Sequence, residues 1–237
     1  MRRGLLLTVA ALAVAAGLGG CDRDRPATRP ATAPATTTRP AAQPAAPATT
    51  ARPGCELTPG APAQGTETAA ADAPSRMALG PSPELRGSAK ARAAARRGQR
   101  LLVSGTVYAA DCTTRLAGAT LQVWQTDAEG VYGPGHGSGN ITCCYLQGEL
   151  RTDARGRYQF TTVKPGAYKG EADPPPAHIH FEVSHPDAGG LMTELLFEGD
   201  PAVVPGTQQG HVARLTPVAG SDPPLQRASF DIVLPRK

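Results

Sequence analysis

The chain has 237 residues and a formal net charge of +4, from 24 Lys and Arg against 20 Asp and Glu. This length allows one domain or two small ones. Every aromatic residue lies after position 100, so the first hundred residues cannot supply much of a hydrophobic core. Seven arginines precede residue 53, so much of the positive charge lies outside the expected folded part and does not support nucleic-acid binding.

The first residues have the features of an export signal. A positive Met1-Arg2-Arg3 start precedes an apolar stretch from Leu5 to Leu18. About 14 apolar residues are too few for a membrane-spanning helix, which needs about 20. Leu18-Gly19-Gly20-Cys21 resembles the bacterial lipobox, in which the cysteine is lipidated. We therefore expect a lipoprotein signal peptide over residues 1–20 and a lipid anchor at Cys21, with an ordinary cleaved signal as the alternative.

The expected product is an exported protein anchored to the bacterial cell envelope, on its periplasmic or extracellular face. From Asp22 to Gly54 the chain is almost entirely Ala, Pro, Thr and Arg. Such a composition buries too little apolar surface to offset the entropy lost on ordering. The sequence therefore predicts a disordered Pro/Ala/Thr-rich tether over residues 21–54, followed by a partly ordered extension over residues 55–100. In that extension Glu84 to Arg97 is expected to be a solvated connector, with a short basic helix as the alternative.

Four cysteines remain after Cys21, which suits an oxidising compartment and suggests disulfides. They are Cys55, Cys112, Cys143 and Cys144. A bond between the adjacent Cys143 and Cys144 would be strained, so we expect these two to form crossed pairs with Cys55 and Cys112. A metal site at Cys143-Cys144 is a weaker alternative.

After residue 100 the pattern changes to short apolar or alternating runs separated by turn residues. The runs cover Leu101–Tyr108, Ala119–Gln125, Tyr158–Val163, Ala177–Val183, Thr193–Phe197 and Ser229–Leu234. This spacing predicts an all-β sandwich or barrel over residues 101–237. Trp124 is expected to lie in its core.

The run Ala177–Val183 carries the candidate chemistry. Because side chains alternate along a strand, Ile179 and Phe181 face the core while His178, His180 and Glu182 face the other way. Two histidines at positions i and i+2 can converge on one metal ion, although a polar stripe facing solvent is the ordinary alternative. The prolines before this strand and the tyrosines that follow other strand ends favour the metal site.

Five blocks resemble the intradiol ring-cleavage dioxygenases in order and spacing. They cover residues 118–132, 152–160, 165–168, 176–181 and 195–201, and residues 230–234 resemble the family's final strand. The resemblance implies a β-sandwich of the intradiol dioxygenase type with a mononuclear non-haem Fe(III). By motif position, the iron ligands would be Tyr132, Tyr168, His178 and His180.

The resemblance also implies the reaction. The enzyme would insert both atoms of O2 into a catechol-type diol, cleaving between the two hydroxylated carbons to a muconate-type diacid, as in aromatic compound catabolism. Tyr168 would be the ligand that the diol displaces and would take up a proton. Family members are often dimeric, and a homodimer is an open alternative here.

Two positions depart from the family's common pattern. Pro175 stands where Arg is common, and Glu194 stands where Gln is common. In the family both lie close to the bound ring, so we expect both to border the substrate. A carboxylate there opposes an anionic diol such as protocatechuate, so we expect a neutral diol, a different substrate or weak activity.

Two readings other than an active dioxygenase stay open. The Thr-Asp-x-x-Gly-x-Tyr-x-Phe pattern at residues 152–160 also resembles carboxypeptidase-regulatory-like and transthyretin-like modules. On that reading the protein is a membrane-tethered β-sandwich binding module without catalysis. The other reading is a family member that has kept the metal and lost the substrate.

Overall fold

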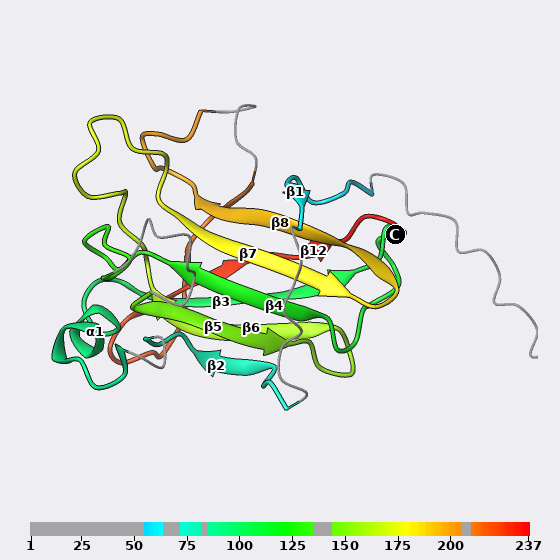
Figure 1. The fold of residues 1–237 in the computed structure, drawn as a ribbon, viewed down its shortest axis with the longest axis horizontal. Coiled ribbons are helices and arrows are strands. Elements are labelled where there is room, and N and C mark those ends of the chain that lie inside the picture. The colour runs from blue at the N-terminus through cyan, green and yellow to red at the C-terminus, as the bar shows by residue number, and fades with distance from the viewer. Residues whose placement is uncertain (1–54, 64–71, 82–84, 135–143, 205–209) are drawn as a thin grey trace, which may run out of the picture. The chain divides into compact units, whose positions relative to one another are not determined.

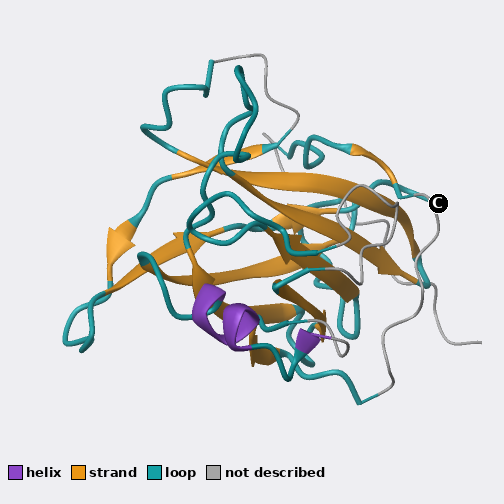
Figure 2. Ribbon diagram, turned by 60° about the vertical axis from the view of Figure 1, so that its left-hand side comes forward, coloured by secondary structure: helices purple, strands orange, loops and turns teal. Residues whose placement is uncertain are grey.

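The computed structural model describes residues 55–63, 72–81, 85–134, 144–204 and 210–237. These residues belong to one unit, Pro47–Lys237, and strands and loops make up nearly all of it (Figures 1 and 2). The prediction of an all-β fold is confirmed. The expected signal peptide, the tether and Cys21 lie outside the described residues. Within the described ranges, no helix has the length and apolar character needed to cross a membrane.

The first sheet has β7 at its centre, and this position matters for the histidines that β7 carries. Its strand order is β1 (Ala61–Pro62), β8 (Ala188–Phe197), β7 (His178–His185), β4 (Thr120–Gln125) and β5 (Leu146–Arg151), with β9 (His211–Ala213) also paired to β8. β7 runs antiparallel to both β4 and β8. Neighbouring strands therefore flank the β7 side chains on both sides.

The second sheet packs against the first. Its order is β10 (Thr216–Pro217), β11 (Leu225–Ser229), β3 (Arg100–Tyr108), β6 (Arg157–Val163) and β2 (Arg76–Ala78), with β12 (Ile232–Val233) paired to the far part of β3. The predicted run Ser229–Leu234 is thus divided between the end of β11 and β12. β5 was not predicted, since its residues include a glycine and charged side chains.

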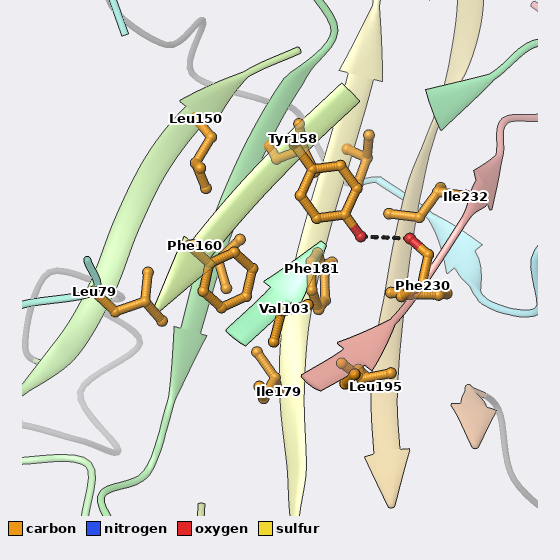
Figure 3. Close-up of a cluster of buried hydrophobic side chains, with 14 of the residues drawn as sticks. Leu79, Val103, Leu150, Tyr158, Phe160, Ile179, Phe181, Leu195, Phe230 and Ile232 are labelled. Carbon is orange, nitrogen blue, oxygen red and sulfur yellow. Dashed lines mark hydrogen bonds between the residues drawn. The ribbon is translucent and has the colours of Figure 1, made fainter. Parts of the chain in front are cut away.

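Aromatic rings join the two sheets in the core. The ring of Phe181 on β7 lies 5.9 Å from that of Phe160 and 5.2 Å from that of Phe230, and Figure 3 shows them together. Tyr158 donates a hydrogen bond of 2.7 Å to the Phe230 carbonyl, so its hydroxyl is satisfied inside the core. Phe181 and Ile179 are fully buried, which confirms the inward face predicted for this strand. Burying side chains of this size contributes about 1.5–3 kcal/mol each.

The expectation of a solvated connector before residue 100 is wrong in part, because α1 (Ala89–Ala94) forms there. The Ser88 hydroxyl caps it by accepting a hydrogen bond from the Ala91 N–H. Ala91 and Ala94 are buried against the core while the basic side chains of the helix stay exposed. Small alanine side chains let the helix approach the sheets closely.

The disulfide links Cys55 to Cys112, so the expected crossed pairing is wrong for these two cysteines. Residues near Cys55 lie beside β12, where Thr58 Oγ1 accepts a hydrogen bond of 2.7 Å from the Val233 N–H. This places the Cys55 and Cys112 α-carbons 5.7 Å apart, within the range that a disulfide spans. Cys144 is buried, and Cys143 lies outside the described residues.

Candidate metal centre

The two histidines of β7 converge on the outer face of the first sheet. Their Nε2 atoms lie 3.0 Å apart. The exposed fraction of the side chain is 4% for His178 and 18% for His180, so neither is part of a stripe that faces solvent. Glu182 shares this face, is buried, and keeps its Oε1 atom without a hydrogen-bond partner among the described residues.

Tyr132 reaches the histidines from a tight turn after β4. The Asp127 carboxylate holds this turn, because its Oδ1 accepts hydrogen bonds from the Glu129 N–H (2.9 Å) and the Val131 N–H (3.0 Å). The Asp127 N–H in turn donates to the Val131 carbonyl at 2.9 Å. The chain therefore leaves the sheet in a fixed direction and buries Tyr132 beside β7.

Tyr168 comes from the loop between β6 and β7, and this loop is bonded to the turn of Tyr132. The Gly166 N–H donates to the Asp127 carbonyl at 2.9 Å, and the Lys169 N–H donates to the Gly130 carbonyl at 3.1 Å. Gly130 has φ +79°, and a Cβ there would overlap the Ala167 carbonyl oxygen. Only glycine permits both this backbone conformation and this close approach. The two tyrosine loops are thus held as one unit.

The four donors predicted from sequence form one cluster. The Tyr168 hydroxyl lies 2.8 Å from His178 Nε2, 3.0 Å from the Tyr132 hydroxyl and 3.5 Å from His180 Nε2. His180 Nε2 lies 2.8 Å from the Tyr132 hydroxyl. Donor atoms that share a metal at about 2.0–2.1 Å are separated by distances of this order.

The orientation of His178 suits a metal ligand. Its Nδ1–H donates to the Pro176 carbonyl at 2.6 Å, which leaves Nε2 with a free lone pair directed at the cluster. Metal-binding histidines commonly donate their second ring N–H in this way.

The two tyrosines would need a nearby cation in order to ionise. Burial, followed by the hydrogen bond to Tyr168, raises the pKa of Tyr132 well above its ordinary value. Burial also raises the pKa of Tyr168. A multivalent cation supplies the positive charge that two buried phenolates require. Two phenolate oxygens and two imidazoles fit Fe(III), because phenolate is a hard anionic donor and imidazole is a usual iron ligand.

One residue beside the cluster was placed differently by sequence reasoning. Trp124 was expected in the core, but it is half-buried on the outer face, where its ring stacks on that of His180 at 4.9 Å and 14°. The strand register pairs Trp124 with His180, which explains the stack. Glu194 borders the histidines, and Pro175 is exposed before β7; the contact of either residue with substrate stays a prediction.

A family model described as Dioxygenase matches residues 73–236. Chlorocatechol 1,2-dioxygenase of Pseudomonas putida is 34% identical over 113 residues, which cover 42% of this chain and 42% of that protein. The protocatechuate 3,4-dioxygenase beta chain of Burkholderia cepacia is 33% identical over 141 residues, 56% of this chain and 58% of that protein. The solved structure of catechol 1,2-dioxygenase from Acinetobacter sp. ADP1, inhibited by bound mercury, has a TM-score of 0.54 at 22% identity and covers 76% of this chain and 63% of that chain.

The matches with these two curated relatives thus span about half of each relative's length. The family model covers most of this chain, from the residues before β2 almost to the C-terminus. The solved structure supports the same β-sandwich. On this agreement of family match and fold, the chain belongs to the intradiol ring-cleavage dioxygenase family.

Proposed function

We propose that the protein is a non-haem Fe(III)-dependent intradiol dioxygenase that acts on a catechol-type diol. The observation that carries this proposal is the convergence of Tyr132, Tyr168, His178 and His180 within 2.8–3.5 Å of one another for the pairs measured. The names of the relatives support a diol substrate, since they include chlorocatechol and catechol dioxygenases. A carboxypeptidase-regulatory-like binding module is not favoured, because it has no need for such a cluster.

The proposed reaction cleaves the bond between the two hydroxylated ring carbons and gives a muconate-type diacid. Both atoms of O2 enter the product, so electrons balance without an external reductant. Bound Fe(III) would supply Lewis-acid activation of the diol and a template for its orientation. The two histidines and Tyr132 would keep this template fixed, since all three are held by the sheet or by the Asp127 turn.

Tyr168 is the more exposed of the two tyrosines and the better placed to accept a proton from the diol. It is half-buried and lies in a loop, whereas Tyr132 is buried. Its hydroxyl lies 3.0 Å from that of Tyr132 and 2.8 Å from His178 Nε2, so a Tyr168 phenolate would lie beside a diol that binds among these donors. Tyr168 would therefore act as the base for one of the two hydroxyl protons.

The location of the enzyme is also a proposal. We place it in the bacterial cell envelope, exported and lipid-anchored through Cys21, on the basis of the N-terminal sequence. The Cys55–Cys112 disulfide is in keeping with an oxidising compartment.

The test is a visible absorption spectrum with metal analysis on the full-length protein. Tyrosinate bound to Fe(III) gives a visible charge-transfer band, so we expect a coloured protein with about one iron per chain that consumes O2 with catechol. Tyr132→Phe and Tyr168→Phe should each weaken the band. Tyr158→Phe is the matched control, because it removes a core hydroxyl and should cost about 1 kcal/mol of stability without changing the band. A protein that stays colourless and iron-free after Fe(III) is supplied would refute the proposal.

A further inference from the structure

Glu194 adds a negative charge to the edge of the donor cluster. The register of the first sheet pairs Glu194 on β8 with His180 on β7, and its neighbours Thr193 and Leu195 are buried. Its Oε1 atom lies 3.6 Å from His180 Nδ1 and 4.0 Å from His178 Nε2. The carboxylate therefore borders the place where a substrate must bind.

No lysine or arginine forms an ion pair with this carboxylate in the part of the chain that the structure describes. The ion pairs of Glu194 there involve only the two histidines. The carboxylate thus lies within 4.0 Å of a ring nitrogen of both histidines, at the edge of the donor cluster.

The side chain of Glu194 is also accessible to a ligand. Its exposed fraction is 35%, against 4% for the side chain of His178. A diol bound at the donors would lie beside this carboxylate, whose Oε1 atom is 3.6 Å from His180 Nδ1. Any charged ring substituent then lies inside the screening length, which is about 10 Å at 0.1 M salt.

We infer that Glu194 makes this site select diols whose ring carries a cationic substituent, such as an ammonium group, and reject diols that carry a carboxylate. The inference rests on the proposed function, because it assumes that the diol binds at the four donors. Opposite charges attract and like charges repel across this short distance, so the expected order of affinity is cationic, then neutral, then anionic. The substrate class is therefore an aminoalkyl-catechol.

The experiment compares three diols on the iron-loaded full-length protein. They are 4-(2-aminoethyl)catechol, catechol and 3,4-dihydroxybenzoate. Affinity is measured without O2, from the change in the visible spectrum, so that the readout does not depend on turnover. Glu194→Gln should shift the affinity ratio of the cationic to the anionic diol by at least about tenfold toward the anionic one, which corresponds to about 1.4 kcal/mol.

The matched control is Glu198→Gln, which makes the same chemical change close by in sequence. Glu198 is exposed and forms an ion pair with Arg214 at 3.5 Å, so its charge is already balanced. This variant should leave the ratio unchanged. In the wild-type protein, the ratio should also fall as salt is raised, because screening weakens the contribution of the carboxylate.

The outcomes separate the inference from the proposed function. Wild-type protein that binds all three diols equally, with no dependence on salt, would overturn the inference and leave the dioxygenase proposal intact. A Glu194→Gln variant that loses its iron would also overturn it, because the carboxylate would then serve the metal instead of the substrate. Wild-type protein that holds iron nowhere would refute the proposed function itself.

Discussion

The single tryptophan of the chain illustrates what can and cannot be read from one sequence at the level of a residue. Alternation correctly separates the inward side chains of β7 from His178 and His180. For Trp124, its hydrophobic character suggested the core, but the residue stacks on His180 instead. This contact depends on the register between β4 and β7, which brings together residues 56 positions apart. No local pattern specifies such a register.

We predict that Trp124 reports on the metal and steadies its ligand. Because its ring lies 4.9 Å from that of His180, Fe(III) binding should quench most of the tryptophan emission. Trp124→Phe should keep a stacked ring and bind iron normally. Trp124→Ala should weaken iron binding by up to about tenfold, since an aromatic pair contributes about 0.5–1.5 kcal/mol. The measurement is a fluorescence and absorbance titration of iron-free protein.

Free N-acetyltryptophanamide at the same iron concentration is the control for quenching by unbound metal. Emission that stays constant while the visible band develops would place the iron away from His180. Equal iron affinity in the Phe and Ala variants would assign the stack no role in holding the ligand.

At the level of elements, one turn sequence is used for two purposes. The pattern Thr-Asp-Ala-x-Gly-x-Tyr occurs at residues 126–132 and again at residues 152–158. In each copy the aspartate Oδ1 accepts two backbone N–H bonds of 2.9–3.0 Å, and the glycine has a positive φ. Yet the first copy leads Tyr132 to the donor cluster, while the second leads Tyr158 into β6 and the core.

The turns are therefore predictable from sequence, but the positions of the two tyrosines in the fold are not. After the second copy the chain pairs with β3 and continues as a strand. After the first copy it is bonded to the Tyr168 loop through Gly130 and Gly166. These hydrogen bonds join residues 39 positions apart and are visible only in the folded structure.

We predict that the aspartates of the two turns separate metal binding from stability. Asp127→Ala removes the acceptor that fixes the approach to Tyr132, so iron affinity should fall by more than about tenfold, the equivalent of roughly one or two hydrogen bonds. Asp153→Ala makes the same change in the other copy. It should keep iron affinity and lower the free energy of unfolding by about 1–3 kcal/mol. Iron titration and urea unfolding measure the two effects.

The pH dependence of the free energy of unfolding provides a control for the Asp153 variant. Hydrogen bonds from the Arg157 backbone and side chain lower the pKa of Asp153 from 3.8 to about 2. Because this pKa is lowered, ionised Asp153 contributes fully to stability above about pH 4, and this contribution is lost as the pH falls toward 2. Asp153→Ala should therefore flatten the loss of stability in that interval.

Equal loss of iron in the Asp127→Ala and Asp153→Ala variants would show that the two turns are not functionally distinct.

For the whole molecule, the sequence predicts an all-β fold but not the strands that residues before 100 add to the two sheets. Residues before 100 were expected to form an extension, yet β1 pairs with β8 in the first sheet and β2 pairs with β6 in the second. Both strands are only two or three residues long, too short to show a periodicity. The start of the described chain therefore lies close to the connection after β3. Cys112 belongs to this connection and forms the disulfide with Cys55.

We predict that this disulfide supplies a large part of the stability. It joins cysteines 57 residues apart, and the chain-entropy model gives about 4 kcal/mol for a loop of that size. Cys55→Ser should therefore lower the free energy of unfolding by about 2–4 kcal/mol in urea. Reductant should destabilise the wild-type protein by a similar amount and leave Cys55→Ser unchanged.

If reductant further lowers the free energy of unfolding of Cys55→Ser, the destabilisation by reductant would come from other cysteines. The iron band of folded Cys55→Ser should match the wild type, because all four donors are held by hydrogen bonds and strand pairs that do not involve the disulfide. The protein would then be most stable where the bond forms. That dependence matches an oxidising compartment and gives the proposed export a physical reason.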